Sequence, residues 1–143
     1  MDLIGLPKIS PRIALIVGRI SLALIYIWFG VLKIFGLSPA SLLIFELYSR
    51  TITFIPFTSF YALFSAFEVV IGLLLLFPKM TKVAFMLMTI HLFTTVLPLV
   101  LLPALAWNGF LVPTLEGQYI IKNAALFALG LLIYVSYQQG QKN

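Results

Sequence analysis

The sequence lacks cysteine altogether and contains a single histidine. Without thiols, the chain has no disulfide framework, no thiolate metal ligand and no cysteine nucleophile. One histidine also excludes multi-histidine metal sites and bis-histidine haem ligation within one chain. We therefore expect neither metal nor haem. No nucleophile–base pair is visible, so an autonomous enzyme is disfavoured, and redox chemistry would need an external cofactor or a partner protein.

Charged residues are also few. Only 9% of the 143 residues are charged, whereas 62% are hydrophobic; a soluble domain carries about 25% charged residues. A water-soluble fold of this size could not bury so much apolar surface, so the excess must face lipid. The net charge of +5 would suggest nucleic-acid binding in a soluble protein. Here the basic residues flank apolar runs, which indicates membrane topology, so we expect membrane lipids and no nucleic acid as partners.

Four apolar segments have roughly the 20 residues needed to cross about 30 Å of hydrocarbon. They cover residues 13–35, 57–77, 83–102 and 119–137. Pro78 separates the second from the third, and Pro98 is expected to kink or fray the last turn of the third. The sequence thus predicts an all-α integral membrane protein, a four-transmembrane-helix bundle that forms one membrane domain over residues 1–143.

Two longer connections join these spans. Residues 36–56 are too polar for another crossing, and Ser38 and Pro39 resemble the N-cap and first turn of a helix. We expect a short interfacial helix there, between the first and second spans. Residues 104–117 are expected to form a loop whose aromatic side chains suit the boundary between membrane and water.

Basic residues favour one orientation of the bundle, because Lys and Arg accumulate in cytoplasmic loops. Only Arg50 lies clearly in a connection on the other side. The basic residues predicted to share the cytoplasmic side are Lys8, Arg12, Lys79, Lys82 and Lys142. Both termini are therefore expected in the cytoplasm and both long connections outside.

Several ionisable side chains fall inside the spans or at their ends. Each costs on the order of 3 kcal/mol on insertion scales, so such groups usually face the bundle interior and find partners. Lys33 and Lys122 lie near span ends, where a lysine can extend to the head groups, but Glu68 and His91 lie near the midplane. The full set is Arg19, Lys33, Glu68, His91 and Lys122.

Helical spacing collects polar and small residues on one face of each span. Tyr26 shares the face of Arg19 and Lys33, and Asn123 lies on the polar face of the fourth span. Small residues on these faces, which let helices approach closely, are Gly30, Gly72 and Gly130.

Stacking these faces inward predicts that Glu68 lies at the centre, approached by Arg19 and Lys33. With Lys122, three cations would then face one carboxylate, and an uncompensated buried charge is costly. The surplus suggests a pocket for a polar or anionic head group on an apolar body, such as a quinone or a lipid. The alternative is a closed polar network that only fixes helix register, in which His91 hydrogen-bonds a neighbouring helix.

Three motifs in order resemble the DoxX family of small four-helix membrane proteins. They are Arg19-x10-Gly30-x2-Lys33, the run Phe67-Glu-Val-Val-Ile-Gly-Leu-Leu-Leu-Leu76, and Glu116-Gly-Gln-Tyr-Ile-Ile-Lys-Asn123. The resemblance implies a four-helix bundle in a prokaryotic inner membrane. Some members of the family are subunits of quinone-linked sulfur oxidation, and others associate with redox-defence enzymes.

Two functions from different classes follow. In the first, the chain is a redox-associated membrane subunit or binding module for a quinone-like or lipid-like molecule. Arg19, Lys33 and Lys122 would then hold head-group oxygens, while Glu68 and His91 move protons. In the second, the chain is a non-catalytic scaffold or assembly partner, bound to a redox enzyme or to further copies of itself, and its buried charges are structural. A small transporter is disfavoured, because no internal repeat is visible.

Overall fold

The computed structural model describes residues 9–141, and four of its helices are long and apolar enough to cross a membrane. The prediction of four such segments is confirmed. They are α1 (Pro11–Ile34), α3 (Phe57–Leu76), the stretch Pro78–Leu101 and α7 (Leu115–Gly140). Pro78–Leu101 comprises the 3₁₀ turn η1 (Pro78–Met80), α4 (Thr81–Val96) and α5 (Pro98–Leu101). Lys8 and Lys142, used above to predict orientation, lie outside the described residues.

Local signals explain where the long helices begin. The Ser10 side chain accepts a hydrogen bond from the Ile13 amide at 3.3 Å, and Pro11 occupies the first turn of α1. In the same way, the Thr114 hydroxyl accepts from the Gly117 amide at 3.1 Å and starts α7. Each cap satisfies a donor that would otherwise lack a partner at a helix start.

Pro98 interrupts the third span as expected. Since proline has no amide hydrogen, it cannot continue the hydrogen bonds of α4. The helix ends at Val96, the Leu97 amide donates to the Thr94 carbonyl at 3.3 Å, and α5 begins at Pro98.

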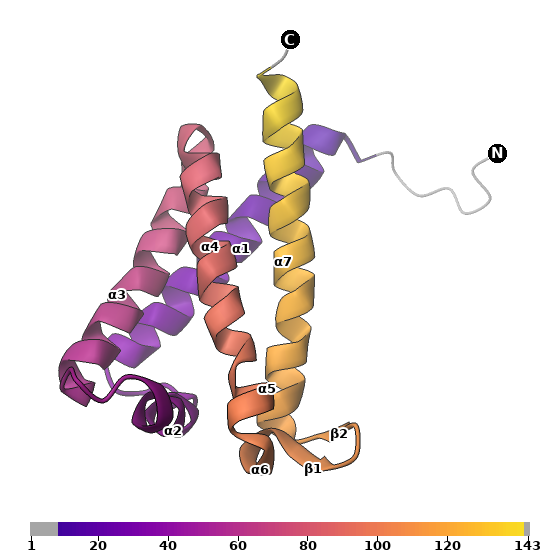
Figure 1. The fold of residues 1–143 in the computed structure, drawn as a ribbon. Coiled ribbons are helices and arrows are strands. Elements are labelled where there is room, and N and C mark those ends of the chain that lie inside the picture. The colour runs from indigo at the N-terminus through magenta and orange to yellow at the C-terminus, as the bar shows by residue number, and fades with distance from the viewer. Residues whose placement is uncertain (1–8, 142–143) are drawn as a thin grey trace.

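The four long helices form two closely packed pairs, α1 with α3 and α4 with α7 (Figure 1). Helix α1 runs obliquely behind the others (Figure 1). The main apolar core joins both pairs and includes Leu22, Ile71, Leu75, Met88 and Ile133.

The shorter elements gather at one end of the bundle, opposite η1 and both ends of the described chain (Figure 1). They are α2 (Ser41–Thr51), α5, α6 (Pro103–Ala106), and the hairpin strands β1 (Trp107–Gly109) and β2 (Val112–Pro113). Residues 104–117 are therefore not a plain loop, because they contain a helical turn and a hairpin.

A short helix occurs between the first two spans, as predicted, but the expected N-cap is wrong. Helix α2 begins at Ser41, whereas Pro39 and Ala40 form a turn. The Ser38 carbonyl accepts from the Ser41 hydroxyl at 2.7 Å. Two further contacts tie α2 to the bundle: the Ser41 and Tyr61 hydroxyls lie 2.8 Å apart, and Arg50 donates to the Leu101 carbonyl at 3.0 Å.

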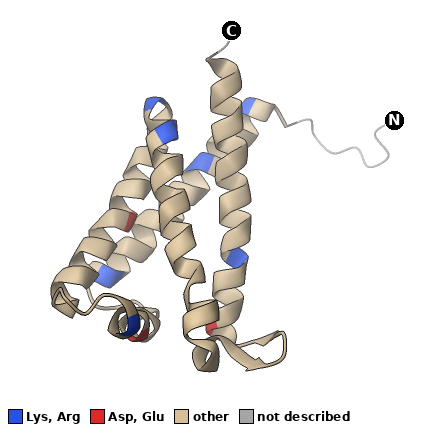
Figure 2. Cartoon of the chain, viewed as in Figure 1, with Lys and Arg blue, Asp and Glu red and all other residues tan. Residues whose placement is uncertain are grey.

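Charged residues are distributed unevenly between the two ends (Figure 2). Among the described residues, Arg12, Lys79 and Lys82 belong to the end that contains η1. Glu46 and Arg50 on α2 and Glu116 in the first turn of α7 lie at the opposite end. The end that contains η1 is therefore the more basic one.

Candidate functional site

A hydrogen-bonded chain of four buried side chains connects α1, α3 and α4. Lys33 Nζ donates to Glu68 Oε2 at 2.7 Å and to the Phe29 carbonyl at 3.4 Å. The other carboxylate oxygen, Oε1, lies 2.9 Å from His91 Nε2. His91 Nδ1 in turn lies 3.3 Å from the Tyr26 hydroxyl. One carboxylate thus links three helices, and Tyr26 returns the chain to α1.

The ion pair indicates which atoms donate and which accept in the hydrogen bonds among these four side chains. Both oxygens of the Glu68 carboxylate are acceptors in these contacts, one from Lys33 Nζ and one from the His91 ring. His91 must then donate through Nε2, which in a neutral imidazole leaves Nδ1 as the acceptor for the Tyr26 hydroxyl. All four groups are satisfied by one consistent arrangement.

Aromatic rings enclose the histidine on several sides. The Phe64 ring stacks on His91 with centroids 5.2 Å apart, and Tyr26 meets it edge-on at 5.3 Å. Phe67 lies 6.2 Å away. These rings pack around the imidazole, which lies between Glu68 and Tyr26.

A cavity of about 580 Å³ lies beside these four hydrogen-bonded side chains. It is bounded by α1, α2, α3, α4, α5 and α7. Its walls are mainly apolar, and α2 contributes Leu43, Ile44 and Leu47. The predicted site residues that line it are Tyr26, Lys33, Glu68, His91 and Asn123. A few polar groups on an apolar surface of this size are typical of sites for small molecules.

Helix α7, the fourth span, contributes Asn123 to the lining of this cavity, whereas Lys122 does not line it. Asn123 Nδ2 donates to the Thr95 hydroxyl at 3.1 Å, which joins α7 to α4. Lys122 is exposed, and its ammonium lies 4.9 Å from the centroid of the Tyr119 ring. Lys122 therefore belongs to the outer surface of α7.

Arg19 does not approach Glu68, so the expected central arrangement is wrong in this respect. Its Nη1 donates to the Leu75 carbonyl at 3.0 Å, near the end of α3. Lys33 follows Arg19 by 14 residues, which is about 21 Å along a helix axis. One glutamate cannot contact both. The count of three cations against one carboxylate therefore does not describe this cluster, where Lys33 alone balances Glu68.

The predicted small residues lie at helix contacts. A Cβ atom on Gly30 would lie 2.9 Å from the Ser65 carbonyl oxygen, and one on Gly72 would lie 2.9 Å from the Ala23 carbonyl oxygen. These two positions let α1 and α3 approach backbone to backbone. A Cβ on Gly130 would meet the end of the Met88 side chain.

The sequence predicted a short helix across the mouth of the bundle, but not which residues of α2 line the cavity wall. The signal was present in its apolar residues Leu43, Ile44 and Leu47, which recur at helical spacing and face the bundle. Within residues 9–141, no group of three His, Cys, Asp or Glu side chains could hold a metal ion.

Comparison with protein-family models, with curated proteins and with solved structures finds no match to this chain. The resemblance to the DoxX family thus stays a prediction from the motifs, and the site is interpreted from its own chemistry.

Proposed function

We propose that this chain is a multi-pass membrane protein that binds a lipophilic molecule with a hydrogen-bonding head group, of the quinone class. The observation that carries the proposal is the buried Lys33–Glu68–His91–Tyr26 chain on the wall of a mainly apolar cavity of about 580 Å³. Hydrogen-bonding groups would select the head, and the apolar walls would cover the body.

Membrane insertion is the first part of this proposal. Four apolar helices with largely exposed hydrophobic surface support it. The basic end that contains η1 would face the cytoplasm, with Arg12, Lys79 and Lys82 at its surface. Helix α2 would then lie at the outer boundary of the membrane.

The donor set fits a head group that carries oxygen acceptors. Lys33 has three N–H groups, of which one is directed to Glu68 and one to Phe29, so a third can reach a ligand. Asn123 uses one N–H on Thr95 and keeps a second donor and its carbonyl oxygen. When bound, a quinone supplies oxygens that change protonation on reduction. His91 bonds Glu68 and Tyr26 through different ring nitrogens, so a proton can pass through its ring between those side chains.

A ligand-binding assay in quinone-free nanodiscs tests this function. Decylubiquinone is expected to raise the thermal unfolding temperature of the wild-type chain, because a ligand that binds only the folded state stabilises it. Leu43→Trp should reduce the shift, because the larger ring projects into the cavity from α2 without altering a charge. Lys122→Gln is the matched control and should keep the shift, because Lys122 does not line the cavity. No shift in the wild-type chain, or an equal shift in Leu43→Trp, would refute the proposal.

A scaffold is the second candidate. In the part of the chain that the structure describes, every buried side-chain nitrogen and oxygen has a hydrogen-bond partner, so the network is complete without a ligand. Under this alternative, mass spectrometry of the protein purified in mild detergent would find a stable protein partner or a homo-oligomer and no co-purified quinone.

A further inference from the structure

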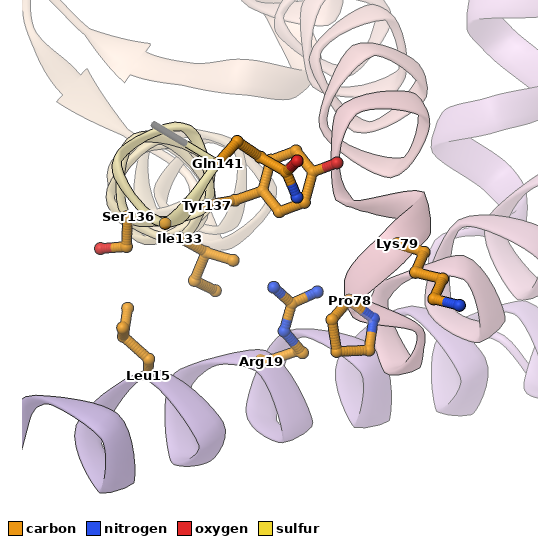
Figure 3. A pocket seen from close by; sticks show the side chains of 9 residues that line it. Leu15, Arg19, Pro78, Lys79, Ile133, Ser136, Tyr137 and Gln141 are labelled. Carbon is orange, nitrogen blue, oxygen red and sulfur yellow. The ribbon is translucent and has the colours of Figure 1, made fainter. Parts of the chain in front are cut away.

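A second cavity, of about 310 Å³, lies at the end of the bundle that contains η1, apart from the site described above. Its wall combines α1, η1 and the last turns of α7, and it includes Arg19, Lys79, Tyr137 and Gln141. The Arg19 guanidinium projects from α1 into the space between η1 and α7, and Tyr137 and Gln141 lie across from it (Figure 3).

Arg19 has unused hydrogen-bonding capacity in this position. A guanidinium carries five N–H donors in a planar fork. One contact of Arg19, to the Leu75 carbonyl, is formed with the described residues. That bond satisfies a carbonyl near the end of α3, and the guanidinium lines the cavity with no other hydrogen bond to the described residues (Figure 3).

The charge of Arg19 is not balanced by any carboxylate among residues 9–141. Glu68 is engaged by Lys33 and His91. Glu46 and Glu116 belong to α2 and to the first turn of α7, at the opposite end of the bundle. Lys79, exposed at the edge of the cavity, adds a second positive charge. A half-buried guanidinium beside apolar helices is costly unless an anion accompanies it.

We propose that this cavity binds a phosphate group, and that the phosphate is the head group of an anionic phospholipid. A planar guanidinium binds phosphate through two parallel hydrogen bonds. Tyr137 and Gln141 supply further donors, and Lys79 adds charge at the mouth. The site lies at the ends of α3 and α7, where the head groups of the leaflet would lie if the bundle spans the membrane as proposed. This step rests on membrane insertion but not on the quinone site.

Native mass spectrometry of the delipidated full-length chain in detergent tests the proposal with three probes. Phosphatidylglycerol carries the phosphate and the acyl chains, diacylglycerol has the same chains without phosphate, and inorganic phosphate lacks the chains. We expect phosphatidylglycerol to bind at least tenfold more tightly than diacylglycerol, consistent with hydrogen bonds to charged groups. Binding of inorganic phosphate at similar affinity would support the phosphate site and assign it to a soluble source. Equal binding of the two lipids would overturn the proposal.

Variants at the end that contains η1 distinguish lipid binding in this cavity from attraction of lipid by the general positive charge of that surface. Arg19→Gln removes the charge and the fork, and should weaken phosphatidylglycerol binding about tenfold. Lys79→Gln, at an exposed position that leaves the fold intact, should weaken it less. Lys82→Gln is the matched control, because Lys82 is exposed at the same end but does not line the cavity. The proposal fails if Lys82→Gln lowers binding as much as Lys79→Gln and Arg19→Gln do. A loss of quinone binding with retained lipid binding would refute only the proposed function.

Discussion

Lys33 and Glu68 form an ion pair with 2.7 Å between Nζ and Oε2, and the side chains expose only 6% and 7% of their surface. The pair joins the last turn of α1 to the middle of α3, and His91 brings α4 to the same carboxylate. A buried pair of this kind is expensive to disrupt, because removal of one partner leaves the other charged and unpaired. The register of α1, α3 and α4 and the chemistry of the proposed binding site therefore depend on the same side chains.

Glu68→Gln should destabilise the bundle by about 3–5 kcal/mol, because Lys33 loses its counter-charge in a buried position. The measurement is the free energy of unfolding in mixed micelles. Glu116→Gln is the matched control: Glu116 is exposed in the first turn of α7, so its loss should cost no more than about 1 kcal/mol. Equal stability of Glu68→Gln and wild type would show that the pair does not hold the helices together.

The double variant Lys33→Met/Glu68→Leu should recover most of that stability, because hydrophobic replacement of a whole buried pair is often neutral or stabilising. The proposed function predicts that the same variant loses the thermal shift with decylubiquinone. A stable double variant that still responds to the quinone would separate the ion pair from ligand binding.

The contacts of His91 with Glu68 and Tyr26 predict one tautomer of its ring. Since the chain has one histidine, its imidazole gives a unique ¹⁵N NMR signal pair. We expect protonated Nε2 and unprotonated Nδ1 in the folded chain. Tyr26→Phe should shift the Nδ1 resonance and lower stability by about 1 kcal/mol, the value of one hydrogen bond. Tyr61→Phe, which removes a contact to Ser41 on α2 instead, should leave the His91 resonances in place. A protonated Nδ1 in the wild-type chain would contradict the assignment.

The four long helices were predictable because each is a long apolar run bounded by polar residues or proline. The elements of residues 104–117 were not. Trp107 pairs with Pro113 across the hairpin, and its indole donates to the Leu99 carbonyl at 2.9 Å. Such contacts depend on how α5 and α7 meet, which composition does not reveal.

The buried partners could be predicted for the polar residues in the middle of a span. Glu68 and His91 lie near the middle of their apolar segments, so they were expected to find partners inside the bundle, and both are buried and hydrogen-bonded. Arg19 and Lys122 were harder to assign. Arg19 is long enough to reach the end of α3, and Lys122 is rotated by about 100° from Asn123 on the same helix. The choice between inward and outward faces on α7 then depends on packing against α4.

Gly30→Ala and Gly72→Ala should each destabilise the chain by about 1–3 kcal/mol, because the added methyl group meets backbone of the facing helix that cannot move alone. Unfolding in mixed micelles measures the change. Gly140→Ala is the matched control, since no atom lies within 4 Å of its added Cβ; it should be neutral or stabilising. Neutral substitution at Gly30 and Gly72 would mean that α1 and α3 pack less closely than described.

The absence of cysteine makes the proposed orientation directly testable, because every introduced thiol is unique. Lys82→Cys places one at the end that contains η1, and Asn108→Cys places one in the hairpin at the opposite end; both positions are exposed. With a membrane-impermeant maleimide applied to intact cells, Asn108→Cys should be labelled and Lys82→Cys protected until the membrane is permeabilised. Leu22→Cys, in the buried core, should resist labelling in both conditions and serves as the control. Labelling of Lys82→Cys with protection of Asn108→Cys would invert the orientation, and labelling of both in intact cells would rule out a bundle that spans the membrane. This result also decides which leaflet could supply a phospholipid to Arg19, because the guanidinium and Lys82 belong to the same end of the molecule.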